Sequence, residues 1–509
     1  MLGRVHDVVI VGAGSAGCVL AARLTEDPST SVLLLEAGPR DRKLHVRVPA
    51  AFSKLFRSAL DWGYDTVPQD ALDGRRLVFP RGKVLGGSAS INAMMAIRGN
   101  RADHDDWPAG WGWDGVAGAY ARSDPHFPRA HQRRPSPLTL DFLDAAAAAG
   151  IPRAADLNGA DNTGAGLTPV SVRRGRRFSV VDGYLRPALR RPNLTVVTGA
   201  RATRLLVERG RARGVAYLLD GHEEEAGADR EVVLAAGAID TPRLLLLSGI
   251  GPPDELERHD IQVVHASPEV GRNLRDHLAN GVLAAVDAET LYTAERPRHL
   301  LSWLVGGRGP LASNVAEAAA FVRIDPEAPA PDLELIFAPV LFEEEGTVPP
   351  SQDGVTVAAV LLQPRSVGEV RLASSDPLAP PEIDPRYLTD PEGRDARMLR
   401  EGVRLARRVL AMPPLARHVR RELLPGEAAV DDTSLDAHLR ARSQTLYHPV
   451  GTCRMGEDEA AVVTPELRVR GIDGLRVVDA SVIPALPRGH TNWPTVMVAE
   501  QAAELMRAA

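Results

Sequence analysis

The sequence is poor in cysteine and has no hydrophobic run of the roughly 18 residues needed to cross a bilayer. Its two cysteines, Cys18 and Cys453, stand in no metal-ligand spacing, so neither a disulfide framework nor a bound metal is expected. Asp7 interrupts the apolar N-terminal segment, which argues against a signal peptide. We therefore expect a cytoplasmic protein without a membrane span.

Signatures of several enzyme classes are also missing. The chain contains no H-E-x-x-H, no G-x-S-x-G and no P-loop, which removes support for a metalloprotease, an esterase or an NTPase. The net charge of −6 gives no reason to expect binding to nucleic acid or to an anionic membrane. At 509 residues, 44% hydrophobic and 25% charged, the composition is that of a globular protein with more than one domain.

A glycine-rich turn near the N-terminus is the most informative stretch. An apolar run at 8–11 precedes Gly12-Ala13-Gly14-Ser15-Ala16-Gly17, a helical pattern covers 18–24, and a second apolar run at 32–35 ends in Glu36. This order predicts a strand, a turn, a helix and a second strand with the G-x-G-x-x-G spacing of dinucleotide-binding proteins.

Each part of this unit has a physical task. Gly12 permits the tight turn, Gly14 lets the backbone approach a pyrophosphate, and Gly17 lets the helix pack closely on the strand. The free N–H groups of the helix N-terminus suit phosphates, and Glu36 can accept hydrogen bonds from a ribose diol.

Further along the chain, two stretches are also rich in glycine and other small residues, as expected near a bound nucleotide. Residues 82–95 carry paired glycines and small hydroxyl residues, which suit either a backbone pressed against a planar ligand or an ordinary loop, with a helix beginning near Ser90. Residues 231–238 read as an apolar strand that ends in small residues, followed by a helix over 241–247. Strands are also expected at 194–197 and 203–207.

The middle of the chain changes character. Strand-like runs at 316–322, 332–337 and 355–362 alternate with loops, and an amphipathic helix covers 395–410, which predicts an antiparallel sheet covered by a helix. The C-terminus returns to a buried strand at 475–479 and a closing helix over 494–505. We expect surface structure at two places, the tryptophans at 107, 111 and 113 and the arginine-rich turn 173–177.

Three of the fourteen histidines stand in suggestive contexts. His448 lies in a tight Tyr-His-Pro-Val-Gly segment, His490 lies just before the last helix, and His277 ends the segment Gly-Arg-Asn-Leu-Arg-Asp-His. Taken singly, each is more often a hydrogen-bonded structural histidine than a catalytic one.

Four separated stretches together resemble the glucose–methanol–choline (GMC) oxidoreductases, and the choline-dehydrogenase-like branch in particular. They are the N-terminal turn with Glu36, residues 82–99, residues 237–252, and the C-terminal pair 447–456 with 478–500. The resemblance implies an α/β fold, with a Rossmann-type FAD-binding domain and a second α+β substrate domain on a mostly antiparallel sheet. The resemblance implies a discontinuous FAD-binding domain made of residues 1–155, 185–280 and 426–509. The substrate-binding domain is expected to consist of residues 156–184 and 281–425.

The resemblance also implies roles for individual residues. The family's active-site histidine falls on His448, and its partner falls on Asn492, which would hydrogen-bond the substrate oxygen. A neutral imidazole at His448 would accept the proton of an alcohol while the flavin takes its hydride. The residues implied in cofactor binding are Gly12, Gly14, Ser15, Ala16, Gly17, Glu36, Ala37, Val84, Gly87, Asn92, Ala202, Asp479, Ala480, Pro494 and Thr495.

Some positions depart from the family pattern. Ile91 stands where some members carry a histidine that attaches the flavin, so non-covalent FAD is expected. His490 and Trp493 differ from the residues common in relatives, which bears on the substrate. Glu317 is either a pocket acid that would suit a cationic substrate or, as a strand residue more often is, a surface or salt-bridged side chain.

The resulting hypothesis is FAD-dependent oxidation of a small-molecule alcohol to an aldehyde or ketone, with O2 or another electron acceptor. The alternative is a lyase or decarboxylase of the same fold that performs no net alcohol oxidation.

Overall fold

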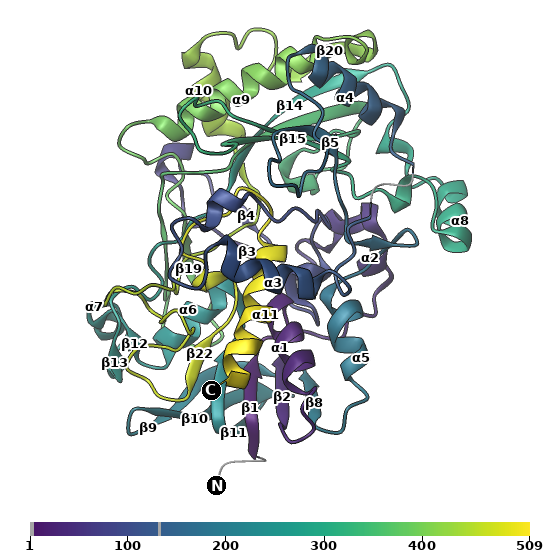
Figure 1. The fold of residues 1–509 in the computed structure, drawn as a ribbon. Coiled ribbons are helices and arrows are strands. Elements are labelled where there is room, and N and C mark those ends of the chain that lie inside the picture. The colour runs from purple at the N-terminus through teal and green to yellow at the C-terminus, as the bar shows by residue number, and fades with distance from the viewer. Residues whose placement is uncertain (1–4, 131–133, 509) are drawn as a thin grey trace.

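The computed structural model describes residues 5–130 and 134–508, and it builds them around two large sheets (Figure 1). The end of the molecule that carries both chain termini holds the mostly parallel sheet, and the opposite end holds the antiparallel one. Both sheets contain seven strands within the described part of the chain. The α/β fold class and the pairing of a Rossmann-type with an antiparallel domain are confirmed, whereas the domain boundaries stay a prediction.

The first sheet is a Rossmann-type sheet with an antiparallel extension. Its strand order is β8 (Leu194–Thr198), β2 (Val32–Glu36), β1 (Val5–Val11), β11 (His222–Leu234), β10 (Arg211–Leu219) and β9 (Arg201–Glu208), with β22 (Leu475–Val477) beside β11. The pairs β8–β2, β2–β1, β1–β11 and β11–β22 are parallel, and β11–β10–β9 are antiparallel. Because parallel strands end at the same edge, their carboxyl ends form a common ligand-binding crevice.

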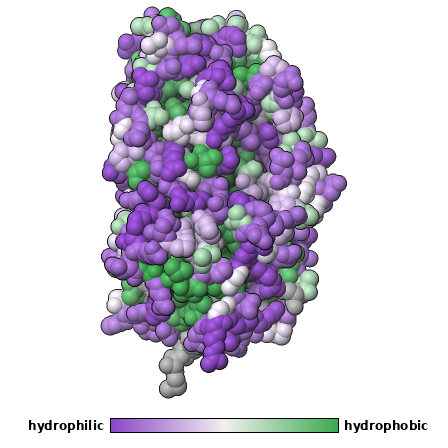
Figure 2. All heavy atoms as spheres, turned by 90° about the vertical axis from the view of Figure 1, so that its left-hand side faces the viewer, coloured by the Kyte–Doolittle hydropathy of each residue, from purple (hydrophilic) through white to green (hydrophobic). Residues whose placement is uncertain are grey.

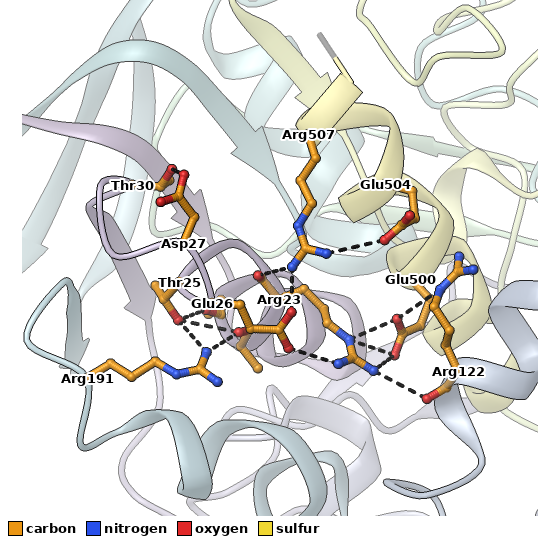
Figure 3. Close-up of polar contacts among 12 residues, drawn as sticks. Arg23, Thr25, Glu26, Asp27, Thr30, Arg122, Arg191, Glu500, Glu504 and Arg507 are labelled. Atoms are coloured by element: carbon orange, nitrogen blue, oxygen red, sulfur yellow. Dashed lines mark hydrogen bonds and ion pairs between the residues drawn. The ribbon is translucent and has the colours of Figure 1, made fainter.

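The two ends of the chain meet through a helix pair. Helix α1 (Ser15–Leu24) follows β1 and packs against α11 (Asn492–Ala508), the last helix. Glu500 is 1% exposed and accepts a hydrogen bond from Arg23 (Nη2, 2.9 Å), and Arg507 contacts Glu26 at 2.6 Å (Figure 3). The Tyr184 hydroxyl also donates to Glu500, at 2.7 Å. A buried carboxylate held by an arginine and a tyrosine fixes the two helices together, so their N-termini open on the same cavity.

The second sheet is antiparallel throughout. Its order is β20 (Val419–Leu424), β14 (Leu278–Val286), β17 (Gly354–Leu361), β16 (Leu333–Ala338), β15 (Ala318–Val322) and β5 (Gly164–Leu167), with β21 (Gln444–Thr445) beside β14. Helices α9 (Arg394–Leu410), α4 (Pro137–Ala148) and α10 (Asp432–Arg442) cover one face with an apolar core. The other face looks toward the Rossmann-type sheet and lines the cavity described below.

Shorter elements complete the chain. The remaining helices are α2 (Leu44–Arg47), α3 (Trp113–Ser123), α5 (Arg186–Ala188), α6 (Gly237–Leu247), α7 (Pro253–Arg258) and α8 (Pro297–Gly306). Two-stranded pairs are formed by β3 (Tyr64–Asp65) with β4 (Val78–Phe79), β6 (Val172–Arg173) with β7 (Arg176–Arg177), β12 (Ile250–Gly251) with β13 (His265–Ala266), and β18 (Glu369–Arg371) with β19 (Glu382–Asp384).

Three local expectations differ from the structure. The helix expected near Ser90 is a 3-10 turn, Gly87–Ser90, because Gly86 and Gly87 both take positive φ (+93° and +54°). Trp107 and Trp111 are buried in the main core rather than at the surface. The turn 173–177 is not wholly solvated, since its last arginine is buried.

One face of the molecule is mostly polar (Figure 2). Figure 2 shows predominantly hydrophilic side chains on one face, with apolar side chains gathered toward the end that carries the termini. Among the described residues, no helix combines the length and the apolar character required to span a bilayer.

Candidate active site

A cavity of about 310 Å³ lies between the carboxyl edge of the Rossmann-type sheet and the open face of the antiparallel sheet. It runs from the glycine-rich turn and Glu36 at one end to His448 and the aromatic side chains of Phe52 and Phe56 at the other. Both chain ends contribute to the lining, since Gly12 and Asn492 are separated by almost the whole sequence.

The glycine-rich turn has the geometry that its motif predicts. Gly12 has φ +99°, and a Cβ there would lie 2.5 Å from the Ala235 carbonyl oxygen, while a Cβ on Gly17 would overlap the Gly12 carbonyl. Gly14 caps α1 without a side-chain bond, and the first turn of that helix carries no acidic residue. The helix N-terminus therefore presents free N–H groups to an anion at the cavity wall.

Glu36 ends β2 at the cavity and is 5% exposed. Its carboxylate accepts hydrogen bonds from the backbone N–H groups of Ala13 (3.0 Å) and Gly38 (2.8 Å). Burial raises the pKa of Glu36 to about 7 against the opposing effect of these two bonds. The side chain thus holds the glycine-rich turn and lies where a ribose diol would meet it.

The second glycine-rich stretch presses against the first. A Cβ on Gly87 would lie 2.8 Å from the Cα atom of Gly14. Asn92 lines the cavity, and its Oδ1 accepts from Arg177 Nη1 at 2.7 Å and from the Met94 N–H at 3.0 Å. Arg177 is 2% exposed, and burial lowers its pKa to about 9. This arginine of the supposed solvated turn instead fixes a cavity-lining side chain.

Asp479 links the C-terminal segment to the start of helix α6, which follows strand β11. Its Oδ2 accepts from the Gly237 N–H (2.8 Å) and the Thr241 hydroxyl (2.6 Å), and its Oδ1 accepts from the Ser481 N–H (2.8 Å). Burial raises the pKa of Asp479 although these bonds favour the carboxylate.

Of the predicted cofactor residues, twelve line the cavity: Gly12, Gly14, Ser15, Ala16, Glu36, Ala37, Gly87, Asn92, Ala202, Asp479, Ala480 and Thr495. The other three, Gly17, Val84 and Pro494, are buried behind it.

These features fit FAD. Three close backbone approaches, a helix N-terminus without acidic residues and a carboxylate at the end of the second strand match the pyrophosphate and ribose of a dinucleotide. No group of three or more potential metal ligands occurs among the described residues.

At the other end of the cavity, His448 lies between two further histidines. His277 Nδ1 and His448 Nδ1 are 2.9 Å apart, and the rings of His448 and His490 meet edge to face with centroids 4.8 Å apart. The backbone N–H of His448 donates to Asp276 Oδ1 at 2.6 Å, which fixes the segment that carries the ring. All three histidines named at the start are therefore brought together.

The hydrogen bonds of His277 determine the tautomer of His448. His277 Nε2 lies 3.1 Å from the Leu362 carbonyl oxygen, which can only accept, so this nitrogen carries the proton. Burial lowers the pKa of His277 to about 3, so the ring is neutral and its Nδ1 is an acceptor. His448 Nδ1 must then be the donor across the 2.9 Å contact. The remaining nitrogen of His448, Nε2, is left with a lone pair.

The surroundings also favour a neutral His448. Burial lowers the pKa of His448 well below its usual value, and the nearby His490, His277 and Arg81 lower it further. Arg81 is close because its Nη2 donates to the Tyr447 carbonyl oxygen at 2.6 Å. The ring is therefore a hydrogen-bond acceptor at a cavity wall, as a general base must be.

His490 has a partner that sequence reasoning missed. Its Nε2 lies 3.2 Å from Glu334 Oε1, and Glu334 is fully buried on β16. Glu334 is the one acid in the otherwise apolar strand Leu333–Ala338, and this misfit in an apolar pattern is the signal that could have identified it.

Asn492 has a hydrogen-bond partner in α1. It begins α11, lines the cavity, and its Oδ1 accepts a hydrogen bond from the Ser15 hydroxyl at 2.6 Å. The amide thus links the first turns of α1 and α11, and the ring adjacent to His448 is that of His490.

Two further side chains are accounted for by packing. Glu317 does not line the cavity, because its carboxylate accepts from Ser136, Thr139 and Ser313 at 2.6–2.7 Å. Trp493 is buried, and its Nε1 donates to the Ser123 hydroxyl at 2.9 Å. Neither interpretation of Glu317 is met, because the side chain is buried at 1% exposure just before β15 and is held by hydroxyl and backbone groups rather than lying at the surface or in a salt bridge.

Comparison with known proteins agrees with this geometry. GMC oxidoreductase family profiles match residues 6–279 and 364–499. The chain is 48% identical to an uncharacterised GMC-type oxidoreductase of Mycobacterium tuberculosis, over 98% of this chain and 99% of that protein. It is 41% identical to an alcohol dehydrogenase [acceptor] of Pseudomonas putida (98% and 95% covered) and 40% identical to the mitochondrial choline dehydrogenase of Mus musculus (99% and 89%).

Solved structures give the same result. Pyridoxine 4-oxidase from Mesorbium loti superposes with a TM-score of 0.91 at 32% identity, with 99% of each chain covered. The formate oxidase of Aspergillus oryzae, studied for modification of its FAD, superposes with a TM-score of 0.92 at 29% identity, covering 100% of this chain and 99% of the other. By sequence, by fold and by the construction of its cavity, the chain belongs to the GMC oxidoreductase family.

Proposed function

We propose that this FAD-dependent oxidoreductase of CH–OH donors oxidises a neutral, mainly apolar alcohol, with Nε2 of His448 as the general base. The observation that carries the proposal is the hydrogen-bond chain from the Leu362 carbonyl through His277 to His448, which supports a free lone pair on Nε2. FAD, when bound, supplies the hydride acceptor. The chain's own residues then have to hold the alcohol and take its proton.

The proton transfer is assigned to named atoms. The alcohol hydroxyl donates to His448 Nε2, and the resulting imidazolium keeps its other proton on Nδ1, hydrogen-bonded to His277. His490, oriented by Glu334, is placed to hydrogen-bond the same substrate oxygen. Asn492 remains a candidate for that role, because its Oδ1 is engaged by Ser15 and its Nδ2–H groups are the donors left. Charge that develops on the oxygen is stabilised by these fixed groups.

The substrate end of the cavity supports an uncharged substrate. Side chains from the antiparallel sheet and the neighbouring segments line it without a charge: Phe52, Phe56, Ala279, Val315, Ala316, Ile336, Ala338, Phe342, Thr356, Ala358, Gln444, Leu446 and Tyr447. Among the described lining residues, the charged side chain beside His448 is that of Arg81, a cation that would repel a quaternary ammonium. The carboxylates of Asp276 and Glu334 lie behind the lining, on His448 and His490.

The aromatic rings do not replace a missing carboxylate. The ring of Phe56 packs edge-on against Phe52 and Tyr447, and Phe52 stacks on Phe342. Trp62, whose face would bind a cation best, already lies under Lys83 and Arg201. A neutral alcohol is therefore favoured over choline, although choline dehydrogenases are among the relatives.

The cofactor is proposed to be held without a covalent bond. Ile91 lines the cavity and offers no atom that can attach a flavin. The electron acceptor and the cytoplasmic location stay predictions; they are tested by reoxidation of the reduced flavin with O2 or quinones, and by cell fractionation.

The test of the proposed function is anaerobic reduction of the bound flavin by a panel of neutral alcohols, followed by absorbance. Bleaching by at least one alcohol, with formation of the matching aldehyde or ketone, is expected. Turnover of a substrate without bleaching would instead indicate a lyase or decarboxylase on the same fold. A flavin that no alcohol bleaches would refute the proposal.

A further inference from the structure

Helix α8 (Pro297–Gly306) presents an apolar face to the outside. Leu301, Leu304 and Val305, at positions i, i+3 and i+4, are 63%, 48% and 83% exposed, and Leu300 beside them is 41% exposed. A surface helix ordinarily turns polar residues outward. Figure 1 shows α8 standing out at the edge of the molecule, away from both sheets.

The opposite side of α8 is firmly attached. Trp303 is fully buried, and its Nε1 donates to the Gly175 carbonyl oxygen at 2.7 Å in the β6–β7 turn. The Arg176 guanidinium lies over the Trp303 ring at 4.4 Å. Gly307 ends the helix with φ +59°. The exposed apolar side chains are thus held in a fixed orientation rather than on a loose segment.

Several exposed basic residues lie on α8, on its flanks and on the turn packed against its attached side, although the chain as a whole is acidic. The β6–β7 turn that touches α8 supplies Arg173, Arg174 and Arg176, and the helix and its flanks supply Arg296, Arg298 and Arg308. Of these, Arg298 is paired with Glu289 at 3.3 Å. The arginine-rich turn therefore belongs to a surface with excess positive charge. Apart from the buried Arg177, its arginines have no role in the proposed reaction.

We propose that α8 and the β6–β7 turn form a docking surface for an anionic lipid bilayer. Leu300, Leu301, Leu304 and Val305 would enter the interface between headgroups and acyl chains, and the arginines would lie among the anionic headgroups. The apolar face argues against a nucleic acid, which offers no apolar groove for such side chains. The local charge, rather than the net charge of −6, decides the attraction.

The position of α8 links this surface to the cavity. The core cluster under α8 contains Trp303, Val48 and Ala51, and the last two lie in or next to the 3-10 helix that carries Phe52 at the substrate end. A docked membrane would therefore lie beside the apolar end of the cavity, where it can deliver an apolar substrate.

The test is sedimentation of the FAD-loaded full-length protein with vesicles of phosphatidylglycerol and phosphatidylcholine at 3:7, against phosphatidylcholine alone. Binding to the anionic vesicles that weakens in 0.5 M NaCl is expected. Val305→Asp should weaken it about 10-fold or more, from the lost burial of one side chain and the added charge. Val430→Asp, at a valine that is 70% exposed elsewhere, is the matched control and should not change it.

The electrostatic part is tested by Arg174→Glu and Arg308→Glu, each expected to weaken binding about fivefold or more. Flavin reduction in solution should be unchanged in all of these variants, so failure of the docking surface is distinguishable from failure of the proposed reaction. Equal binding to neutral and anionic vesicles, no vesicle binding, or equal effects of Val305→Asp and Val430→Asp would overturn the proposal. A dimer in solution that Val305→Asp converts to a monomer would instead assign this face to a second copy of the chain.

Discussion

Replacing His277 tests whether a hydrogen-bond chain selects the tautomer of His448. His277→Phe removes the acceptor 2.9 Å from His448 Nδ1, so the neutral His448 ring can carry its proton on either nitrogen. A hydrogen bond of this kind is worth about 0.5–1.5 kcal/mol net. Because 1.4 kcal/mol corresponds to a factor of ten, the ratio of the two tautomers should shift roughly 2- to 12-fold. If the tautomers of the free ring are otherwise equal in energy, the population with a free Nε2 should fall from about 70–93% to about 50%, a factor of up to about two. The rate of flavin reduction should fall by that factor, with little change in substrate affinity.

His277→Asn is the matched control for this variant. Both substitutions remove the bond to the Leu362 carbonyl at 3.1 Å, so both share any loss of stability from that source. Only the asparagine retains an acceptor that can face His448 Nδ1. Stopped-flow reduction of the bound flavin under anaerobic conditions measures the difference. Equal rates in the Phe and Asn variants would refute the tautomer argument, whatever their common loss.

Three further predictions concern substrate, pH and stability. The value of kcat/KM for 3,3-dimethylbutan-1-ol should exceed that for choline, its cationic isostere, by at least about 10-fold, because none of the described side chains that line the substrate end is a carboxylate that would offset burial of the cation; a preference for choline would contradict the neutral lining. Burial lowers the pKa of His448, so the base stays unprotonated as the pH falls and the acid limb of kcat/KM should lie below pH 6.5; a limb at pH 7 or above would contradict this. Glu500→Gln should reduce the free energy of unfolding in urea by about 1.5–3 kcal/mol, because Arg23 and Tyr184 lose a buried carboxylate; an unchanged transition midpoint would show that this contact does not stabilise the helix pair.

The nucleotide-binding half was readable from the sequence because its signals are local. Gly12 and Gly17 act through backbone clearance, Gly14 caps α1 at the cavity, and Glu36 ends a strand at a fixed distance along the chain, so spacing alone predicts their places. The strands and helices around them have strong periodic patterns. Their bounds differ by a few residues, as at α1, which begins at Ser15 rather than at Cys18.

The catalytic end was less readable because its contacts are long-range. His277, His448 and Glu334 come from segments far apart in the chain, and no spacing reveals that two imidazoles share a hydrogen bond. Asn492 and His490 are two residues apart, and only the fold separates a residue that faces Ser15 from one that faces His448. The arginines at 173–177 were separated in the same way, since Arg177 is buried behind Asn92 of the cavity wall and the others lie at or near the surface.

The most direct test of the central claim is the rate of flavin reduction in His448→Ala, measured anaerobically with a substrate alcohol after absorbance has verified that the variant holds FAD. Loss of a general base predicts a decrease of about 10²- to 10⁴-fold. Reduction at the wild-type rate would show that His448 does not take the proton, and the assignment of the active site would fail with it.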